Sequence, residues 1–337
     1  MAHALRLARR GLGNVWPNPA VGCVLVAQGE VVGRGWTQPG GRPHAEAMAL
    51  AQAGPRARGA TAYVTLEPCA HHGRTPPCAE ALIAAGVRRV VSALTDPDPR
   101  VAGRGHAMLR AAGCEVREGV LQAAACELQA GFLSRLTRGR PFVTLKLASS
   151  FDGRIATARG ESQWITGPPA RRHVHLLRLM HDAIMVGGGT ARADRPSLNV
   201  RGLGAPLQPV RVIASRRPLP DLPAEDAAHG PLWQVEGDIS DIMRELARRG
   251  ITRLFCEGGG QLAAGMLGAG AVDQLVGYTA GLALGAEGRP AIGPLGLERL
   301  ASAPRFRLVE SRRLGDDLMH RWRRVTDDPA QDRHSQL

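Results

Sequence analysis

Four residues between positions 44 and 78 have the side chains that a catalytic zinc site needs. His44 supplies an imidazole, Cys69 and Cys78 supply thiols, and Glu46 supplies a carboxylate that is not required as a ligand. Three protein ligands of this kind leave the fourth tetrahedral position of Zn²⁺ open to water, whereas a structural site fills all four with protein. Zinc makes such a water a nucleophile near neutral pH. The pattern therefore predicts a hydrolytic zinc centre with ligands His44, Cys69 and Cys78, and Glu46 as the catalytic residue that moves protons.

The order of these residues resembles the zinc deaminases, in which His-x-Glu precedes Pro-Cys-x-x-Cys. Here eight residues separate Cys69 from Cys78 where two are usual. The longer loop, which ends Gly73-Arg74-Thr75-Pro76-Pro77-Cys78, and the upstream segment Pro17-Asn18-Pro19-Ala20-Val21-Gly22-Cys23-Val24 closely resemble the bifunctional deaminase–reductases of riboflavin biosynthesis. Arg74 projects from this loop and either recognises part of a phosphorylated substrate, together with His71 or His72, or is a solvated loop arginine.

From Phe142 onward the sequence resembles the reductase half of the same family, whose fold is similar to dihydrofolate reductase. The resemblance is carried by the run from Phe142 to Gly153 and by Glu161-Ser162-Gln163-Trp164-Ile165-Thr166. Two further segments read as strand, glycine turn and helix, with Gly187-Gly188-Gly189 and Gly258-Gly259-Gly260 at the turns. Such turns let backbone N–H groups approach a phosphate, and the helix N-terminus favours the charge. A glycine triplet alone also fits an ordinary tight turn.

The resemblance implies particular cofactor and substrate contacts in this half. Expected contacts with NADPH are Ala148, Trp164, Thr190, Asp194, Ser215, Gly259, Gly260, Gln261, Leu262, Ala263, Ala264 and Gly265. Expected contacts with the substrate are Ser162, Arg178, Leu198, Arg201 and Glu257. Arg178 and Arg201 also have a physical argument, because guanidinium groups bind phosphate bidentately. Lys146 is expected to polarise the ribose or its ring-opened imine, and Ala214 stands where many members of the family have Asp.

Length and element pattern predict two α/β domains. The chain has 337 residues, more than one core usually organises. Alternating strands and helices, including a helix over 121–136, predict an α/β layer sandwich in residues 1–138. The resemblance implies that this is a cytidine-deaminase-like α/β/α sandwich and that a dihydrofolate-reductase-like α/β domain follows in residues 141–326. The candidate linker is Thr137 to Pro141, residues 216–238 are expected to form a surface loop, and residues 327–337 a disordered tail.

Composition restricts the partners. A net charge of +13 would suit nucleic acid as well as small phosphorylated substrates, but only 4% of residues are aromatic, and no basic stretch carries interleaved aromatic side chains for base stacking. The N-terminus has charges where a signal peptide needs an apolar core, and no apolar run reaches a membrane span. We therefore expect a cytoplasmic enzyme that binds neither nucleic acid nor membranes. We also expect the chain to form a homo-oligomer, a dimer or a tetramer.

The resemblance implies two successive reactions on one phosphorylated pyrimidine. The first is zinc-dependent hydrolytic deamination of 2,5-diamino-6-ribosylamino-4(3H)-pyrimidinone 5′-phosphate. The second is NADPH-dependent reduction of the ribosyl side chain, which gives 5-amino-6-ribitylamino-uracil 5′-phosphate. Two alternatives remain at this point: a deaminase that edits tRNA or binds nucleic acid, which the charge favours, and a chain in which only one of the two domains is active.

Overall fold

The computed structural model describes residues 1–71, 76–98 and 102–325. These residues divide into two compact units, of which the first spans Met1–Gly139 and the second begins at Arg140. None of the helices in this described part of the chain has both the length and the hydrophobicity that crossing a membrane requires. Each unit is built around its own β-sheet.

The first unit contains a five-stranded sheet in the order β2-β1-β3-β4-β5. Its strands are β1 (Gly22–Ala27), β2 (Glu30–Trp36), β3 (Thr61–Val64), β4 (Arg89–Ser92) and β5 (Glu115–Arg117). Strand β1 pairs antiparallel with both β2 and β3, whereas β3, β4 and β5 are parallel. The helices are α1 (Ala2–Ala8), α2 (Ala45–Ala53), α3 (Cys78–Ala84), α4 (Arg104–Ala111), α5 (Gln122–Leu128) and α6 (Ala130–Arg138), with 3-10 turns at Arg9–Gly11, Pro39–Gly41 and Gly54–Ala57.

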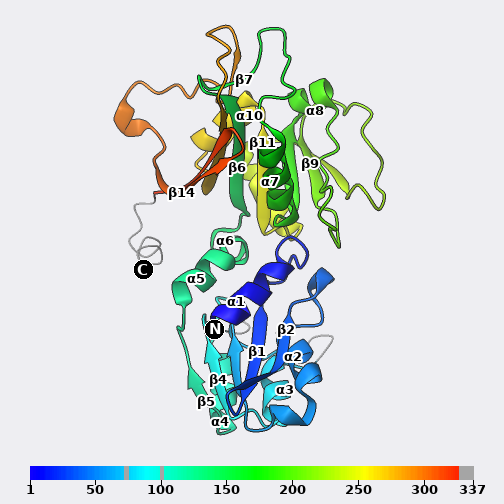
Figure 1. Cartoon of the computed structure of the whole chain (residues 1–337), viewed down its shortest axis with the longest axis vertical. Helices are drawn as coiled ribbons and strands as arrows, with labels where there is room; N and C mark the ends of the chain where they lie inside the picture. The colour runs from blue at the N-terminus through cyan, green and yellow to red at the C-terminus, as the bar shows by residue number, and fades with distance from the viewer. Residues whose placement is uncertain (72–75, 99–101, 326–337) are drawn as a thin grey trace. The chain divides into compact units, whose positions relative to one another are not determined.

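Glycines in β1 and β2 let helices pack directly against the sheet backbone. A Cβ at Gly22 would lie 2.0 Å from the carbonyl oxygen of Ala4 in α1, and a Cβ at Gly35 would lie 2.1 Å from that of Ala45 in α2. Gly35 pairs with Cys23, the neighbour of Gly22, and successive residues of a strand face opposite sides of a sheet. Helices α1 and α2 therefore cover opposite faces, and the predicted α/β/α sandwich is confirmed (Figure 1).

The second unit contains an eight-stranded sheet in the order β10-β9-β8-β11-β6-β12-β15-β14. Its strands are β6 (Phe142–Ser150), β8 (Ala183–Gly187), β9 (Val210–Ala214), β10 (Leu232–Val235), β11 (Arg253–Gly258), β12 (Gln274–Ala280), β14 (Phe306–Leu314) and β15 (Asp317–Arg324), and β7 (Arg154–Ala156) pairs with β13 (Arg289–Pro290) separately. The run from β10 to β12 is parallel, whereas β15 and β14 are antiparallel. The helices are α7 (Pro168–Leu179), α8 (Gly188–Asp194), α9 (Ile239–Arg248) and α10 (Gly260–Gly268), with a 3-10 turn at Leu300–Ser302.

Parallel strands in this unit bring distant segments to one edge of the sheet. The carboxyl ends of β9, β8 and β11 are adjacent, and they lead into Ser215, α8 and the turn before α10 respectively. The strands pack through a core that includes Ile184, Ile213 and Phe255, each without exposed surface. This edge is where a ligand site is expected in an open parallel sheet.

Three expectations about local structure are wrong. The helix predicted over 121–136 is two helices that meet at Gln129, a buried residue whose side-chain amide donates a hydrogen bond to the carbonyl of Ala20 at 2.7 Å. Helix α6 continues to Arg138, so the connection to β6 consists only of residues 139–141. The segment 216–238 is not only a loop, because β10 lies within it and pairs with β9, and Arg249 covers the ring of Trp233.

Candidate functional sites

The three predicted zinc ligands come from the starts of two helices and the end of a strand. His44 is the N-cap of α2, Cys78 is the first residue of α3, and Cys69 lies in the segment that follows β3. The candidate ligand atoms of these three side chains all lie within 4.8 Å of one another. An N-cap residue has non-helical backbone angles, and His44 has φ −71° and ψ 161°. The direction of the His44 imidazole is therefore not set by the helical spacing that sets the direction of the Glu46 side chain.

The contacts among the three ligands fit a zinc ion. The sulfur of Cys78 lies 3.3 Å from Nδ1 of His44, and the sulfur of Cys69 accepts a hydrogen bond from the Cys78 backbone N–H at 3.3 Å. The pKa of Cys69 is lowered, because the Cys78 thiol and then His44 hydrogen-bond to its sulfur and stabilise the thiolate. One imidazole and two sulfurs, one of them already thiolate-like, form the donor set of a catalytic zinc site.

Glu46 lies beside these ligands but is enclosed. It is the second residue of α2 and is only 3% exposed. Burial, followed by the charge of Cys69, raises the pKa of Glu46 to about 7. A carboxyl group in such a position can hold or release a proton at neutral pH. Of the loop expected beside this centre, Arg74 and His72 lie outside the described residues, whereas His71 is described and half-buried.

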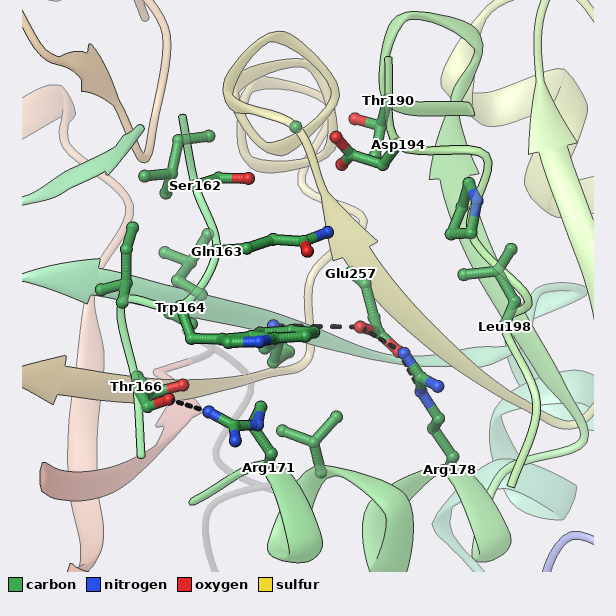
Figure 2. Close-up of a pocket in the computed structure, with 18 of the residues that line it drawn as sticks. Ser162, Gln163, Trp164, Thr166, Arg171, Arg178, Thr190, Asp194, Leu198 and Glu257 are labelled. Atoms are coloured by element: carbon green, nitrogen blue, oxygen red, sulfur yellow. Dashed lines mark hydrogen bonds and ion pairs between the residues drawn. The ribbon is translucent and has the colours of Figure 1, made fainter. Parts of the chain in front are cut away.

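The second unit contains a pocket of about 440 Å³ that gathers residues from widely separated segments. It is lined by ten of the predicted contacts, namely Ala148, Ser162, Trp164, Arg178, Thr190, Asp194, Leu198, Arg201, Glu257 and Gly259, together with Lys146. Figure 2 shows Trp164 across the pocket from Leu198, with Glu257 between them and Thr190 and Asp194 above. The pocket therefore brings the predicted substrate and cofactor residues together.

A buried charge cluster forms the floor of this pocket. The guanidinium of Arg178 donates hydrogen bonds to both carboxylate oxygens of Glu257, from Nε to Oε1 at 2.5 Å and from Nη2 to Oε2 at 3.0 Å. Nζ of Lys146 lies 3.8 Å from Oε2 of the same carboxylate. Burial alone would raise the pKa of Glu257, but Arg178 and Lys146 outweigh burial and the pKa is lowered. Burial lowers the pKa of Lys146. Arg178 also donates a hydrogen bond to the carbonyl of Asn199 at 2.9 Å, so each of its three guanidinium nitrogens already donates a hydrogen bond within the protein.

The glycine turn after β11 lies close to helix α8 at the edge of the sheet. Gly259 has φ +98°, and a Cβ there would lie 2.6 Å from the hydroxyl oxygen of Thr190. That hydroxyl also lies 3.5 Å from the carbonyl of Gly258, so the turn after β11 and helix α8 are in contact. Backbone exposed by glycine beside an open pocket suits a phosphate-bearing cofactor. The residues present therefore fit a dinucleotide.

Not every residue of the predicted cofactor set lines the pocket. Gly260, Gln261, Leu262, Ala263, Ala264 and Gly265 belong to α10, in which Ala263 and Ala264 face the protein interior. Ser215 lies at the end of β9, where its hydroxyl accepts hydrogen bonds from Arg192 at 3.4 Å and from the Arg217 backbone N–H at 3.2 Å. The sequence interpretation placed these residues near the cofactor, but only Gly259 of the glycine run reaches the pocket wall.

Sequence reasoning missed pocket residues on α7. Arg171 and His175 line the pocket beside Arg178, and Arg171 covers the ring of Trp164 at 4.6 Å from its centroid. Positions 171, 175 and 178 follow the i, i+4, i+7 spacing of one helix face. That spacing of basic residues is visible in the sequence and would have identified this face.

Comparison with known proteins covers nearly the whole chain. Residues 1–94 match the cytidine and deoxycytidylate deaminase zinc-binding region, and residues 141–320 match the RibD C-terminal domain. The riboflavin biosynthesis protein RibD of Escherichia coli K12 is 44% identical, over 94% of this chain and 96% of that protein. The chain belongs to the RibD family. RibD of Haemophilus influenzae is also 44% identical, over 94% and 95% of the two chains.

Solved structures of RibD proteins have the same fold. Acinetobacter baumannii RibD form 1 is 39% identical with a TM-score of 0.88, over 96% of this chain and 98% of that one. A deaminase/reductase from Thermotoga maritima is 34% identical with a TM-score of 0.86, over 96% and 97% of the two chains. As a RibD protein the chain is a bifunctional deaminase and reductase of riboflavin biosynthesis, with zinc and NADPH as its cofactors. Its substrate is a small molecule.

Proposed function

We propose that His44, Cys69 and Cys78 hold the zinc ion of the deaminase half and that Glu46 is its catalytic residue. The convergence of one imidazole and two sulfurs within 4.8 Å is the observation that supports this assignment most strongly. Zinc bound there supplies Lewis acidity, which makes water nucleophilic near neutral pH. Glu46 takes the proton of the water and delivers protons to the ring nitrogen and to the departing amine. Its enclosed position keeps bulk water from competing for those protons.

We propose that the pocket of the second unit binds NADPH and the ribosyl substrate side by side. The cofactor supplies the hydride. Ala148, Trp164, Thr190, Asp194 and Gly259 would orient it, with Ser215 and the remaining residues from Gly260 to Gly265 nearby. Ser162, Leu198 and Arg201 would contact the substrate. Arg178 and Glu257 would face the substrate as well. Glu257, which accepts two hydrogen bonds from Arg178, would also hold Lys146, whose ammonium would polarise the ribosyl oxygen or imine.

We propose as substrate 2,5-diamino-6-ribosylamino-4(3H)-pyrimidinone 5′-phosphate, and the name of the Thermotoga maritima relative supports this choice. That protein is called a diaminohydroxyphosphoribosylaminopyrimidine deaminase and a 5-amino-6-(5-phosphoribosylamino)uracil reductase. Arg74 remains a proposed phosphate contact. The net charge of +13 would attract such an anion, and this small-molecule chemistry leaves nucleic acid without a role.

We further propose that residues 1–138 form the deaminase domain and residues 141–326 the reductase domain. The two family matches, 1–94 and 141–320, support this division. None of the six cysteines is paired in a disulfide, and Cys69 and Cys78 are the proposed zinc ligands, a usage that supports a reducing compartment such as the cytoplasm. Assembly into a dimer or tetramer is part of the same proposal and is measured by sedimentation of the full chain.

A coupled assay tests the two-site assignment. Wild-type protein given the diamino substrate should release ammonia without NADPH and should oxidise NADPH only after deamination. Glu46→Gln should keep zinc but lose ammonia release by at least about 100-fold, the scale of general acid–base catalysis. Glu115→Gln, whose side chain is 66% exposed on β5, is the matched control and should behave as wild type. Normal ammonia release by Glu46→Gln would refute the role of Glu46.

A further inference from the structure

A buried carboxylate next to a zinc ligand joins two segments of the first unit. Glu67 stands two residues before Cys69 and is 4% exposed. Its Oε2 accepts hydrogen bonds from the backbone N–H groups of Asp96 at 3.1 Å and Gly103 at 2.9 Å. Its Oε1 accepts from those of Gly105 at 2.9 Å and His106 at 3.2 Å. Four backbone donors thus converge on one side chain, which supplies the hydrogen bonds that a buried carboxylate needs.

The same carboxylate fastens the zinc-ligand segment to the start of α4. Gly105 and His106 lie in the first turn of α4, whose N–H groups have no partner within the helix. The backbone is also in direct contact there, because a Cβ at Gly105 would lie 2.0 Å from the carbonyl oxygen of Pro68. Pro68 is the residue between Glu67 and Cys69. The approach is possible only because residue 105 is glycine.

Cys69 is held on its other side by α3. Its carbonyl accepts a hydrogen bond from the Ala79 N–H at 3.2 Å, and its sulfur accepts one from the Cys78 N–H at 3.3 Å. Helices α3 and α4 pack against each other. The segment from Glu67 to Cys69 therefore contacts the N-termini of two helices, and loss of the Glu67 hydrogen bonds would release its attachment to the start of α4.

We propose that Glu67 is a positioning residue for the zinc site: its carboxylate anchors the Cys69 segment on α4 and so sets the distance between the Cys69 sulfur and the other two ligands. The inference rests on the proposed ligand set. Residues that orient metal ligands without touching the metal change metal affinity by about 10- to 100-fold when they are replaced. Glu67 can orient a ligand in this way. Its carboxylate accepts four hydrogen bonds from α4 and from the segment that precedes α4, and its backbone is joined to Cys69 through Pro68.

Glu67→Gln in the full chain tests the proposal with almost no change in volume. Each carboxylate oxygen of Glu67 accepts two N–H groups, so a glutamine in either orientation places its own NH₂ against two donors. The zinc dissociation constant, measured by competition with a chromophoric chelator, should rise about 10- to 100-fold. In the cobalt-substituted protein the sulfur-to-cobalt absorption should weaken or shift. Reduction of a supplied deaminated substrate should be unchanged, which reports that the second unit is folded, and an unchanged far-UV circular dichroism spectrum of the full chain reports that the first unit is folded as well.

Glu118→Gln is the matched control. Glu118 also holds α4, through Arg110 at 2.5 Å and through Nδ1 of His106 at 3.1 Å, and it accepts a hydrogen bond from Thr95 at 3.1 Å. None of these three partners belongs to the segment from Glu67 to Cys69, and the variant leaves the hydrogen bond from the His106 backbone N–H to Glu67 in place, so it should bind zinc as wild type does. Zinc affinity at the wild-type level in Glu67→Gln, or an equal loss in Glu118→Gln, would overturn the proposal.

Gly105→Ala provides a second route that leaves the carboxylate in place. Alanine is favoured over glycine within helices, so any loss must come from the contact of the new methyl with Pro68. Zinc affinity should fall in this variant too, and normal affinity would overturn the proposal even if Glu67→Gln fails to fold. Wild-type protein that holds no zinc would instead overturn the proposed ligand set, and this inference with it.

Discussion

At the scale of single residues, the pairing of buried charges determines which cations of the proposed reductase pocket can bind a substrate. Glu257 neutralises Arg178 through two hydrogen bonds, and Lys146 lies within ion-pair distance of the same carboxylate. The side chains of all three are between 10% and 17% exposed. Charges in such a place need partners, because burial without compensation costs several kcal/mol. Since Arg178 is committed to Glu257 and Asn199, Lys146 and Arg201 are the cations with more freedom to meet a substrate.

Replacement of Glu257 should therefore disable reduction alone. In Glu257→Gln the two buried cations repel each other without a carboxylate between them, and removal of one partner of a buried pair costs roughly 3–5 kcal/mol. We expect NADPH oxidation to fall by at least about 100-fold, whereas ammonia release stays at the wild-type rate.

Glu245→Gln is the control for this prediction. Glu245 pairs with Arg249 on α9 with its side chain 33% exposed, and such a surface pair contributes at most about 1 kcal/mol. Both rates should be normal in this variant. Loss of ammonia release in Glu257→Gln would contradict the assignment of Glu257 to a separate reductase site.

At the scale of elements, close backbone contact positions the residues of the zinc site. Helix α2 carries Glu46 and is capped by His44, and it lies on β2 at Gly33 and Gly35. A Cβ at Gly33 would be 2.2 Å from the carbonyl oxygen of Ala49. Because carbonyl groups of the helix cannot move without moving the helix, both glycines set the depth of α2 above the sheet.

Gly35→Ala should disturb the zinc site without touching a ligand. The added methyl would lie 2.1 Å from the carbonyl oxygen of Ala45 and 2.8 Å from Cβ of Met48, so α2 must shift away from β2. Overpacking of this kind costs about 1–3 kcal/mol. We expect lower thermal stability, weaker zinc binding and slower ammonia release. Gly268→Ala, where nothing lies within 4 Å of the new methyl, should not lower stability; a Gly35→Ala protein with unchanged zinc binding would contradict this account.

At the scale of the whole molecule, each half has its own sheet and its own site. The proposed zinc ligands and Glu46 belong to the unit Met1–Gly139, and every residue that lines the proposed reductase pocket lies beyond Arg140. Units with separate cores can in principle fold alone. The two reactions should therefore respond to different treatments of one chain.

Removal of zinc should separate the two activities. A chelator that strips the metal should stop ammonia release, and reduction of a supplied deaminated substrate with NADPH should continue at the normal rate. Cys78→Ser should reproduce this result without a chelator. The measurement is ammonia release and NADPH oxidation in parallel, with added zinc as the reversal control. If chelation stopped reduction in protein that remained folded, independent sites would be excluded.

Short motifs in the sequence predicted the zinc chemistry, and the resemblance to a family implied the reductase chemistry. His44, Glu46, Cys69 and Cys78 could be recognised because a metal site restricts residue types and short spacings, and a pattern of this kind is local. The glycine turns after β8 and β11 were recognisable for the same reason, since close backbone approach requires glycine. Family membership confirmed the two activities that the resemblance implied.

Only the tertiary structure decided which distant residues support these sites. Glu67 meets Gly105 across 38 positions, Arg178 meets Glu257 across 79, and Gln129 meets Ala20 across 109. No local period links such pairs, because their proximity results from strand order and helix packing. The missed strand β10 has the same cause: its four residues are stabilised by pairing with β9 and not by their own pattern. Short motifs in the sequence therefore predict which side chains can act as ligands. The residues that hold each ligand in place come into contact with it only after folding.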